Sequence, residues 1–312
     1  MGFLRLLEAL RTPALSAFFS AVTRLGDVTV FMIVAMTVFW CIDKRRAYYI
    51  FLVGFVGTAM NQWLKLLFRV PRPWVLDPSF TIVESARAAA TGYSFPSGHT
   101  QNIVGTMGVL AVSSRSRALR AVCVALMLLV PFSRMYLGVH TPLDVGAAFV
   151  LALALTAALY PAFSSQERFL QKTFVLILLT AALCLCYLLF SLLFPFGPAV
   201  DAENLQSGRE NGFTLLGCAA GLVCAWLFDR NYLHFDTRAP LPGQALKLVL
   251  GLALLMAVRV GVKALLAALA PGFVAADMLR YFLMVLVGAC LWPMTFPFFA
   301  RVGAKEREHA KL

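Results

Sequence analysis

The sequence predicts an all-α, polytopic integral membrane protein built as a helical bundle. Of its 312 residues, 61% are hydrophobic and only 13% are charged, whereas soluble domains carry about 25% charged residues. The mean hydropathy is +0.81, and long apolar stretches recur along the whole chain. A composition of this kind excludes an ordinary water-soluble globule.

Nine apolar stretches approach the ~20 residues that a helix needs to cross the hydrocarbon core. They are residues 27–43, 47–67, 99–113, 120–137, 141–161, 173–195, 212–229, 247–269 and 279–299. The preceding segment, residues 3–24, is apolar but interrupted by Arg5, Glu8, Arg11 and Arg24. We therefore expect one or two short helices in the membrane interface there, with a partial tenth span as the alternative.

Two parts of the chain differ in their polar content. Residues 1–165 hold every polar motif described below, and residues 166–312 add four spans without a recognisable catalytic pattern. Arg259 and Lys263 lie one helical turn apart in the second part. They are open to three interpretations: an ion pair or water-facing contact, a headgroup or substrate contact, or snorkelling at a helix end. Gly217 and Gly221 have the spacing that lets two helices approach closely.

The distribution of charge predicts which end of the bundle faces the cytoplasm. The net charge is +12, which in a membrane protein indicates basic loops against an anionic surface, so no nucleic-acid partner is expected. One set of loops carries 15 of the 27 Lys and Arg residues. By the positive-inside rule these loops are cytoplasmic, in a cell (inner or plasma) membrane, and all the polar motifs face the external side.

The first motif is Lys65-x6-Arg72-Pro73, at the outer end of a predicted span. The planar fork of an arginine suits phosphate, and lysine adds a compact positive charge. The alternative is that both cations simply snorkel to water. The loop 74–95 that follows is predicted to form a lid or selectivity wall, with Glu84 paired to Arg87.

The second motif, Pro96-Ser97-Gly98-His99, precedes the span 99–113. A Ser-Gly turn at a helix N-terminus presents free backbone N–H groups, which form an anion site, and Ser97 is also suited to cap the helix. His99 at the mouth of this helix is placed to give a proton to a departing oxygen.

The third motif is Ser133-Arg134-x5-His140-x3-Asp144. Because residues four apart share a helix face, Asp144 is expected to accept a hydrogen bond from one ring nitrogen of His140. The other nitrogen is then free to act as a nucleophile. A carboxylate this close to a bilayer is costly and indicates a function.

Together the three motifs resemble the signature of the type 2 phosphatidic acid phosphatase superfamily, over about residues 45–160. The resemblance implies a six-helix phosphatase core, a phosphohistidine intermediate and no metal or other cofactor. It implies that His140 is the nucleophile, that Asp144 orients it and that His99 is the acid and then the base. It further implies that the phosphoryl oxygens are bound by Lys65, Arg72, Ser97, Gly98 and Arg134.

The expected function is hydrolysis of a lipid phosphate or isoprenyl pyrophosphate at the external leaflet, so the expected partners are the bilayer and a phosphorylated membrane lipid. A phosphotransferase that uses the same phosphohistidine is one alternative. A phospholipid flippase with a vestigial phosphate site is another. The sequence does not predict the headgroup, the tail or the oligomeric state.

Overall fold

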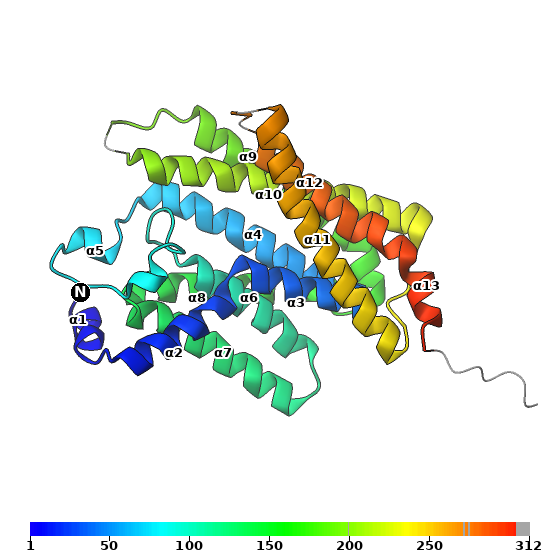
Figure 1. Cartoon of the computed structure of the whole chain (residues 1–312), viewed down its shortest axis with the longest axis horizontal. Coiled ribbons are helices and arrows are strands. Elements are labelled where there is room, and N and C mark those ends of the chain that lie inside the picture. The colour runs from blue at the N-terminus through cyan, green and yellow to red at the C-terminus, as the bar shows by residue number, and fades with distance from the viewer. Residues whose placement is uncertain (199, 271, 274, 304–312) are drawn as a thin grey trace, which may run out of the picture.

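The computed structural model describes residues 1–198, 200–270, 272–273 and 275–303, and every regular element within those ranges is helical (Figure 1). The first half forms α1 (Gly2–Ala9), α2 (Pro13–Thr23), η1 (Arg24–Gly26), α3 (Val28–Cys41), α4 (Lys44–Phe68), α5 (Pro73–Leu76), η2 (Glu84–Ala86), α6 (Gly98–Ser113), α7 (Arg117–Tyr136) and α8 (Pro142–Phe163). The second half forms α9 (Gln166–Leu193), α10 (Ala202–Phe228), η3 (Asp229–Leu233), α11 (Leu241–Leu269), α12 (Ala276–Leu286), η4 (Val287–Leu291), η5 (Trp292–Thr295) and α13 (Phe296–Arg301). The prediction of an all-α membrane bundle is confirmed.

A helix lies at each of the nine predicted spans, but two of these helices are too short to cross a bilayer alone. α3 has 14 residues and α6 has 16, against the ~20 that a full span needs. Within the described residues, seven stretches are long and apolar enough to span, or eight if α2–η1 and α3, which meet at a bend of 49°, form one broken span. The prediction of nine full spans is therefore wrong, because α6 begins at Gly98, beside the polar residues of the second motif, and ends at Ser113.

The predicted interfacial segment forms two short helices, α1 and α2. Thr12 caps α2 by accepting a hydrogen bond from the backbone of Leu15, and Pro13 occupies the first helical position, where the lack of an N–H costs nothing. α1 is amphipathic, with Leu4 and Leu7 buried and Leu6 exposed. Both helices therefore cover the core while leaving apolar side chains on the outside.

The central helix is α4, which packs against α3, α6, α8, α9 and α10. Its buried face carries Tyr48 and Tyr49, each 1% exposed, and the Tyr49 ring stacks on Phe163 of α8 at 4.8 Å. α10 packs against α9 and α12, and α11 lies against α12, α13 and α3 (Figure 1). The C-terminal helices thus extend one side of the core instead of closing a separate bundle.

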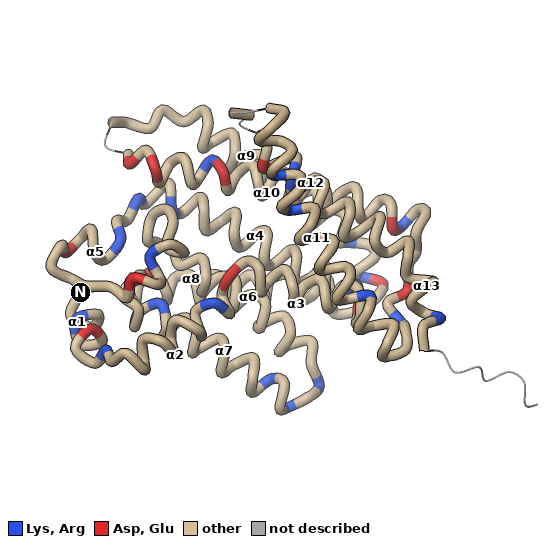
Figure 2. Tube along the Cα trace, viewed as in Figure 1, with Lys and Arg blue, Asp and Glu red and all other residues tan. Residues whose placement is uncertain are grey.

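Charged residues gather toward the two ends of the core helices, and the middle of α4 carries none (Figure 2). The end that holds the N-terminus of α4 carries the cations predicted to be cytoplasmic. There Lys44 pairs with Asp229 at 2.7 Å, and Lys247 donates to the carbonyl of Thr237 at 2.9 Å. Three further cations of that set, Lys305, Arg307 and Lys311, lie outside the described residues.

The C-terminal part departs from the predicted boundaries at α10. Residues 202–211, expected in a polar loop, are helical, because Asp201 caps the helix by accepting a hydrogen bond from the backbone of Asn204 at 2.8 Å. The predicted close approach is confirmed: an added Cβ at Gly217 would lie 2.2 Å from the carbonyl oxygen of Met278 in α12.

Arg259 and Lys263 lie on α11, the candidate span with the smallest buried share. Within the described ranges neither has a carboxylate within 4.0 Å, so the ion-pair interpretation is not supported. Lys263 is exposed and Arg259 is half-buried, which favours contact with water or lipid.

Candidate functional site

All eight residues predicted for the site lie at one end of the bundle, where α4 and α7 end and α6 and α8 begin. Lys65 is in the last turn of α4 and is 6% exposed; its Nζ donates a hydrogen bond to the carbonyl of Tyr93. α4 ends at Arg69, which adopts the left-handed conformation. The chain then turns so that Arg72 lies beside the same loop.

Arg72 is held by backbone carbonyls of the loop 74–95. Its Nη2 donates to Thr91 at 2.7 Å and its Nε donates to Gly92 at 3.1 Å. Its Nη1 donates to Val139 at 3.0 Å. The end of this loop therefore orients the cations of the first motif, a role that the sequence did not reveal.

Arg134, in the last turn of α7, is fully buried. Its Nη1 donates to the hydroxyl of Thr23 at 2.8 Å, whereas Nε and Nη2 have no hydrogen-bond partner in the described part of the chain. No carboxylate among the described residues lies within 4.0 Å of Lys65, Arg72 or Arg134. Because buried charges are costly without a counter-charge, these three cations form a binding place for an anion.

The second motif forms the N-terminus of α6, as predicted. The Ser97 hydroxyl caps the helix and accepts hydrogen bonds from the Thr100 hydroxyl at 3.0 Å and the Thr100 backbone at 3.4 Å. An added Cβ at Gly98 would meet nothing within 4 Å, so open space lies beside this turn. Since the first N–H groups of a helix have no intrahelical partner, the turn can donate them to an anion in that space.

The geometry at His140 differs from the prediction. His140 does not share a helix face with Asp144, because α8 begins at Pro142 with Thr141 as its cap and Asp144 in its first turn. Asp144 Oδ2 accepts hydrogen bonds from the Thr141 backbone at 2.7 Å and the Ser94 hydroxyl at 2.6 Å. His140 Nδ1 lies 3.5 Å from that oxygen, close enough for a weak ionic contact only.

The ring of His140 is 2% exposed and faces Arg72. Arg72 Nη1 lies 3.0 Å from Nε2 and 3.5 Å from Nδ1. A guanidinium only donates, so Nε2 is the unprotonated nitrogen and Nδ1 carries the proton toward Asp144. Burial, together with the positive charges of Arg72 and Arg134, holds the pKa of His140 well below its ordinary value. The imidazole is therefore neutral and available as a nucleophile.

His99 has a partner that the sequence analysis missed. Its Nε2 lies 2.8 Å from Oδ1 of Asp27, between η1 and α3. Thr23 and Ser94, which contact Arg134 and Asp144, were missed as well. Asp27 and Thr23 lie more than 70 positions before the residues that they contact, and no local spacing connects them.

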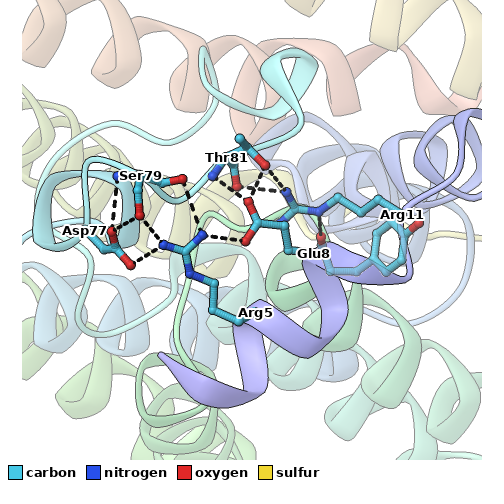
Figure 3. Close-up of polar contacts among 7 residues, drawn as sticks. Arg5, Glu8, Arg11, Asp77, Ser79 and Thr81 are labelled. Carbon is cyan, nitrogen blue, oxygen red and sulfur yellow. Dashed lines mark hydrogen bonds and ion pairs between the residues drawn. The ribbon is translucent and has the colours of Figure 1, made fainter.

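The loop 74–95 is fastened to α1 by a polar cluster (Figure 3). Arg5 pairs with Asp77 at 2.5 Å and with Glu8 at 2.9 Å, and Glu8 accepts a hydrogen bond from the backbone of Thr81 at 2.8 Å. Arg11 donates to the Thr81 carbonyl at 2.8 Å. We call these five residues the N-terminal latch. The predicted pair between Glu84 and Arg87 in the same loop is confirmed at 2.7 Å.

Comparison with known proteins finds two family models along this chain. Residues 45–168, which contain all three motifs, match the model described as PAP2 superfamily. Residues 213–305 match the model described as PAP2 superfamily phosphatase, transmembrane extension. The C-terminal helices, for which the motifs implied nothing, thus match a recognised extension of the same superfamily.

Two individual proteins are similar to parts of the chain. Undecaprenyl-diphosphatase BcrC of Bacillus subtilis (strain 168) is 31% identical over 112 residues, which cover 36% of this chain and 54% of BcrC, about half its length. The crystal structure of Aquifex aeolicus LpxE has 25% sequence identity and a TM-score of 0.44, covering 50% of this chain and 92% of that one. The resemblance carried by the three motifs is confirmed by the two family models: the chain belongs to the PAP2 superfamily.

Proposed function

We propose that this protein is an integral membrane phosphatase that hydrolyses a lipid phosphate or lipid diphosphate through a phosphohistidine. One observation carries the proposal: three buried cations, which have no carboxylate partner among the residues that the structure describes, surround a buried, neutral imidazole. The formal charges of Lys65, Arg72 and Arg134 exceed those of Asp27 and Asp144, so the site favours an anion. Positioning and charge stabilisation supply most of the catalysis of phosphoryl transfer.

In the first step, Nε2 of His140 attacks phosphorus and forms an N–P bond while the bond to the leaving oxygen breaks. The electron pair of the broken bond stays on that oxygen, and His99 gives it a proton. Lys65, Arg72 and Arg134 balance the charge on the equatorial oxygens, and the backbone N–H groups at Gly98 donate to them. The dephosphorylated lipid is the first product.

In the second step, water attacks the phosphorus of the phosphohistidine and gives a proton to His99, which the first step left neutral. The N–P bond breaks, its electron pair returns to Nε2, and inorganic phosphate leaves. Hydrogen bonds from Ser94 and from the backbone of Thr141 fix the carboxylate of Asp144, which faces Nδ1 of His140. This carboxylate stabilises the positive charge that the ring gains on phosphorylation.

A lipid is the proposed substrate because the site lies at the end of a bundle whose helices are long and apolar enough to span a membrane. The name of one similar protein supports this choice: BcrC is an undecaprenyl-diphosphatase. We place the site at the external leaflet, since 15 of the 27 Lys and Arg residues belong to the loops predicted to be cytoplasmic.

The activity is tested with purified protein in detergent and a panel of undecaprenyl diphosphate, phosphatidic acid and phosphatidylglycerol phosphate. Wild-type protein should release inorganic phosphate from at least one of them, with and without EDTA. His140→Asn should abolish release, and the matched variant His234→Asn, at the opposite end of the bundle, should not. A His140→Asn protein that keeps its activity would refute the mechanism.

Two further measurements test the remaining parts of the proposal. Adding lipid or sugar alcohols as acceptors should yield phosphate, and a phosphorylated alcohol as the main product would make the protein a phosphotransferase. Glu84→Cys and Asp236→Cys, each made in a variant whose seven native cysteines are replaced by alanine and labelled in intact cells with a membrane-impermeant maleimide, test the orientation. Labelling only at position 236 would show that the site faces the cytoplasm instead of the external side.

A further inference from the structure

Asp27 contacts the predicted acid of the site but belongs to none of the three motifs. Its Oδ1 lies 2.8 Å from Nε2 of His99, and it precedes the region that matches the PAP2 model, residues 45–168. The side chain of His99 is 13% exposed and that of Asp27 is 40% exposed. The contact therefore lies at the edge of the site, with His99 on the buried side and Asp27 on the exposed side.

The carboxylate of Asp27 does not serve its own helix. Asp27 is the residue at the cap position of α3, yet its side chain makes no capping hydrogen bond there. The caps of α4 and α10, Asp43 and Asp201, do make such bonds. An aspartate at a cap position usually stabilises its helix, so one that contacts a histidine instead has a function other than capping.

The backbone beside Asp27 is shaped for this contact. An added Cβ at Gly26 would lie 3.0 Å from Cβ of His99 and 3.0 Å from Val130, so a larger residue here would require these side chains to shift. Thr23, one turn earlier, accepts the hydrogen bond from Arg134. The segment of residues 23–27 therefore reaches both the predicted acid and a predicted phosphate-binding cation.

We propose that Asp27 is a positioning residue that fixes the ring of His99 for proton transfer, which deepens the proposed function and rests on it. The Asp27 carboxylate accepts the Nε2–H of His99, so Nδ1 is the nitrogen that exchanges the proton. Nδ1 has no hydrogen-bond partner in the described ranges. In the first step Nδ1–H passes to the leaving oxygen, and in the second step Nδ1 takes a proton from water. Asp27 stays ionised throughout.

The electrostatics of the site explain why a carboxylate is needed here. His99 must carry a positive charge before it donates a proton. Burial of the ring and the nearby positive charges of Arg134 and Arg72 disfavour that charge. Asp27 is the carboxylate in direct contact with the ring within the described residues, and an anion beside an imidazolium stabilises it. The same logic makes a buried aspartate essential beside the histidine of serine proteases.

The test uses two phosphate monoesters whose leaving groups differ in their need for an acid. An alkyl oxygen, as in decyl phosphate, needs a proton to leave, whereas the phenolate of 4-nitrophenyl phosphate leaves without one. Asp27→Asn should lower kcat/KM for decyl phosphate by about 10- to 100-fold, part of what a general acid contributes. For 4-nitrophenyl phosphate the change in kcat/KM, which reports only the steps up to release of the leaving group, should be under about 3-fold.

The variants separate a positioning role from a structural one. Turnover of 4-nitrophenyl phosphate by Asp27→Asn shows that the protein is folded, and Asp27→Glu should recover part of the decyl phosphate activity. Asp236→Asn, an exposed aspartate at the opposite end, is the matched control and should change neither rate. Equal loss on both esters, or no loss on either, would overturn the proposal while leaving the phosphatase function standing. Full activity of His140→Asn would instead overturn both.

Discussion

Nη1 of Arg72 lies 3.0 Å from Nε2 of His140, so the guanidinium that we expect to bind phosphate also contacts the nitrogen that we propose as the nucleophile. The contact leaves Nε2 without a proton, because an arginine can only donate. A phosphoryl group must enter between these two side chains, and its oxygens then replace the imidazole as acceptors for Arg72. Binding and activation of the nucleophile are thus coupled through one hydrogen bond.

Arg72→Lys should lower kcat/KM by about 10²- to 10³-fold, the usual cost of one donor to a transition-state oxygen. Arginine bonds to three carbonyls and to His140 through its planar fork, and a lysine ammonium cannot span these positions. The measurement is steady-state kinetics on the best lipid of the panel. Arg69→Lys, an exposed neighbour, is the control, and equal activity of the two variants would contradict the assigned role.

The His140 ring should stay neutral well below the ordinary imidazole pKa of about 6.5. Burial and the neighbouring cations lower this pKa, so the unfolded chain binds a proton that the folded protein does not. The free energy of unfolding should therefore fall as the pH drops below about 6.5. His140 would remain a nucleophile in that range.

The titration is measured by NMR of ring-labelled histidine in detergent. The chain has four histidines, and His140→Asn assigns the signal. A midpoint for His140 at or above the ordinary value would contradict the prediction. Lys65→Met, which removes one of the cations that lower this pKa, should move the midpoint upward.

The N-terminal latch should open in acid. Hydrogen bonds from Ser79, and then the ion pair with Arg5, lower the pKa of Asp77. The stabilisation from this carboxylate is therefore fully present above the ordinary aspartate pKa of about 3.9 and is lost as the pH falls through the lowered value. Asp77→Asn should open it at neutral pH. Hydrogen exchange of residues 2–11 and 77–81 measures this, with Glu84→Gln as the control in the same loop. Unchanged exchange in Asp77→Asn would show that the latch does not hold the loop.

Two helical glycines should respond to alanine in opposite directions. At Gly217 an added Cβ would lie 2.2 Å from the backbone of Met278, so α10 and α12 must separate, at a cost of about 1–3 kcal/mol. At Gly261 an added Cβ meets nothing within 4 Å, so alanine should stabilise α11 by up to about 1 kcal/mol. Thermal unfolding in detergent measures both. A Gly217→Ala protein as stable as wild type would contradict the close packing of these helices.

Hydropathy alone predicted the membrane bundle and placed a helix at each expected span. It overestimated the number of full spans because α6 begins inside the bundle, where Ser97 caps it beside the cations. It also missed the first turns of α10, since their polar residues resemble a loop until the cap at Asp201 is seen. Local composition predicts well which segments are buried, but it does not predict the residue at which a capped helix starts.

The three motifs determined which cations and histidines form the site, because each string stands at a helix end and all these ends lie on one side of the bundle. Only the tertiary structure decided how the residues are held. It set His140 before α8 instead of on it, and it brought Ser94, Thr23 and Asp27 against Asp144, Arg134 and His99. Spacing encodes contacts within one helix, whereas these contacts depend on how separate helices pack.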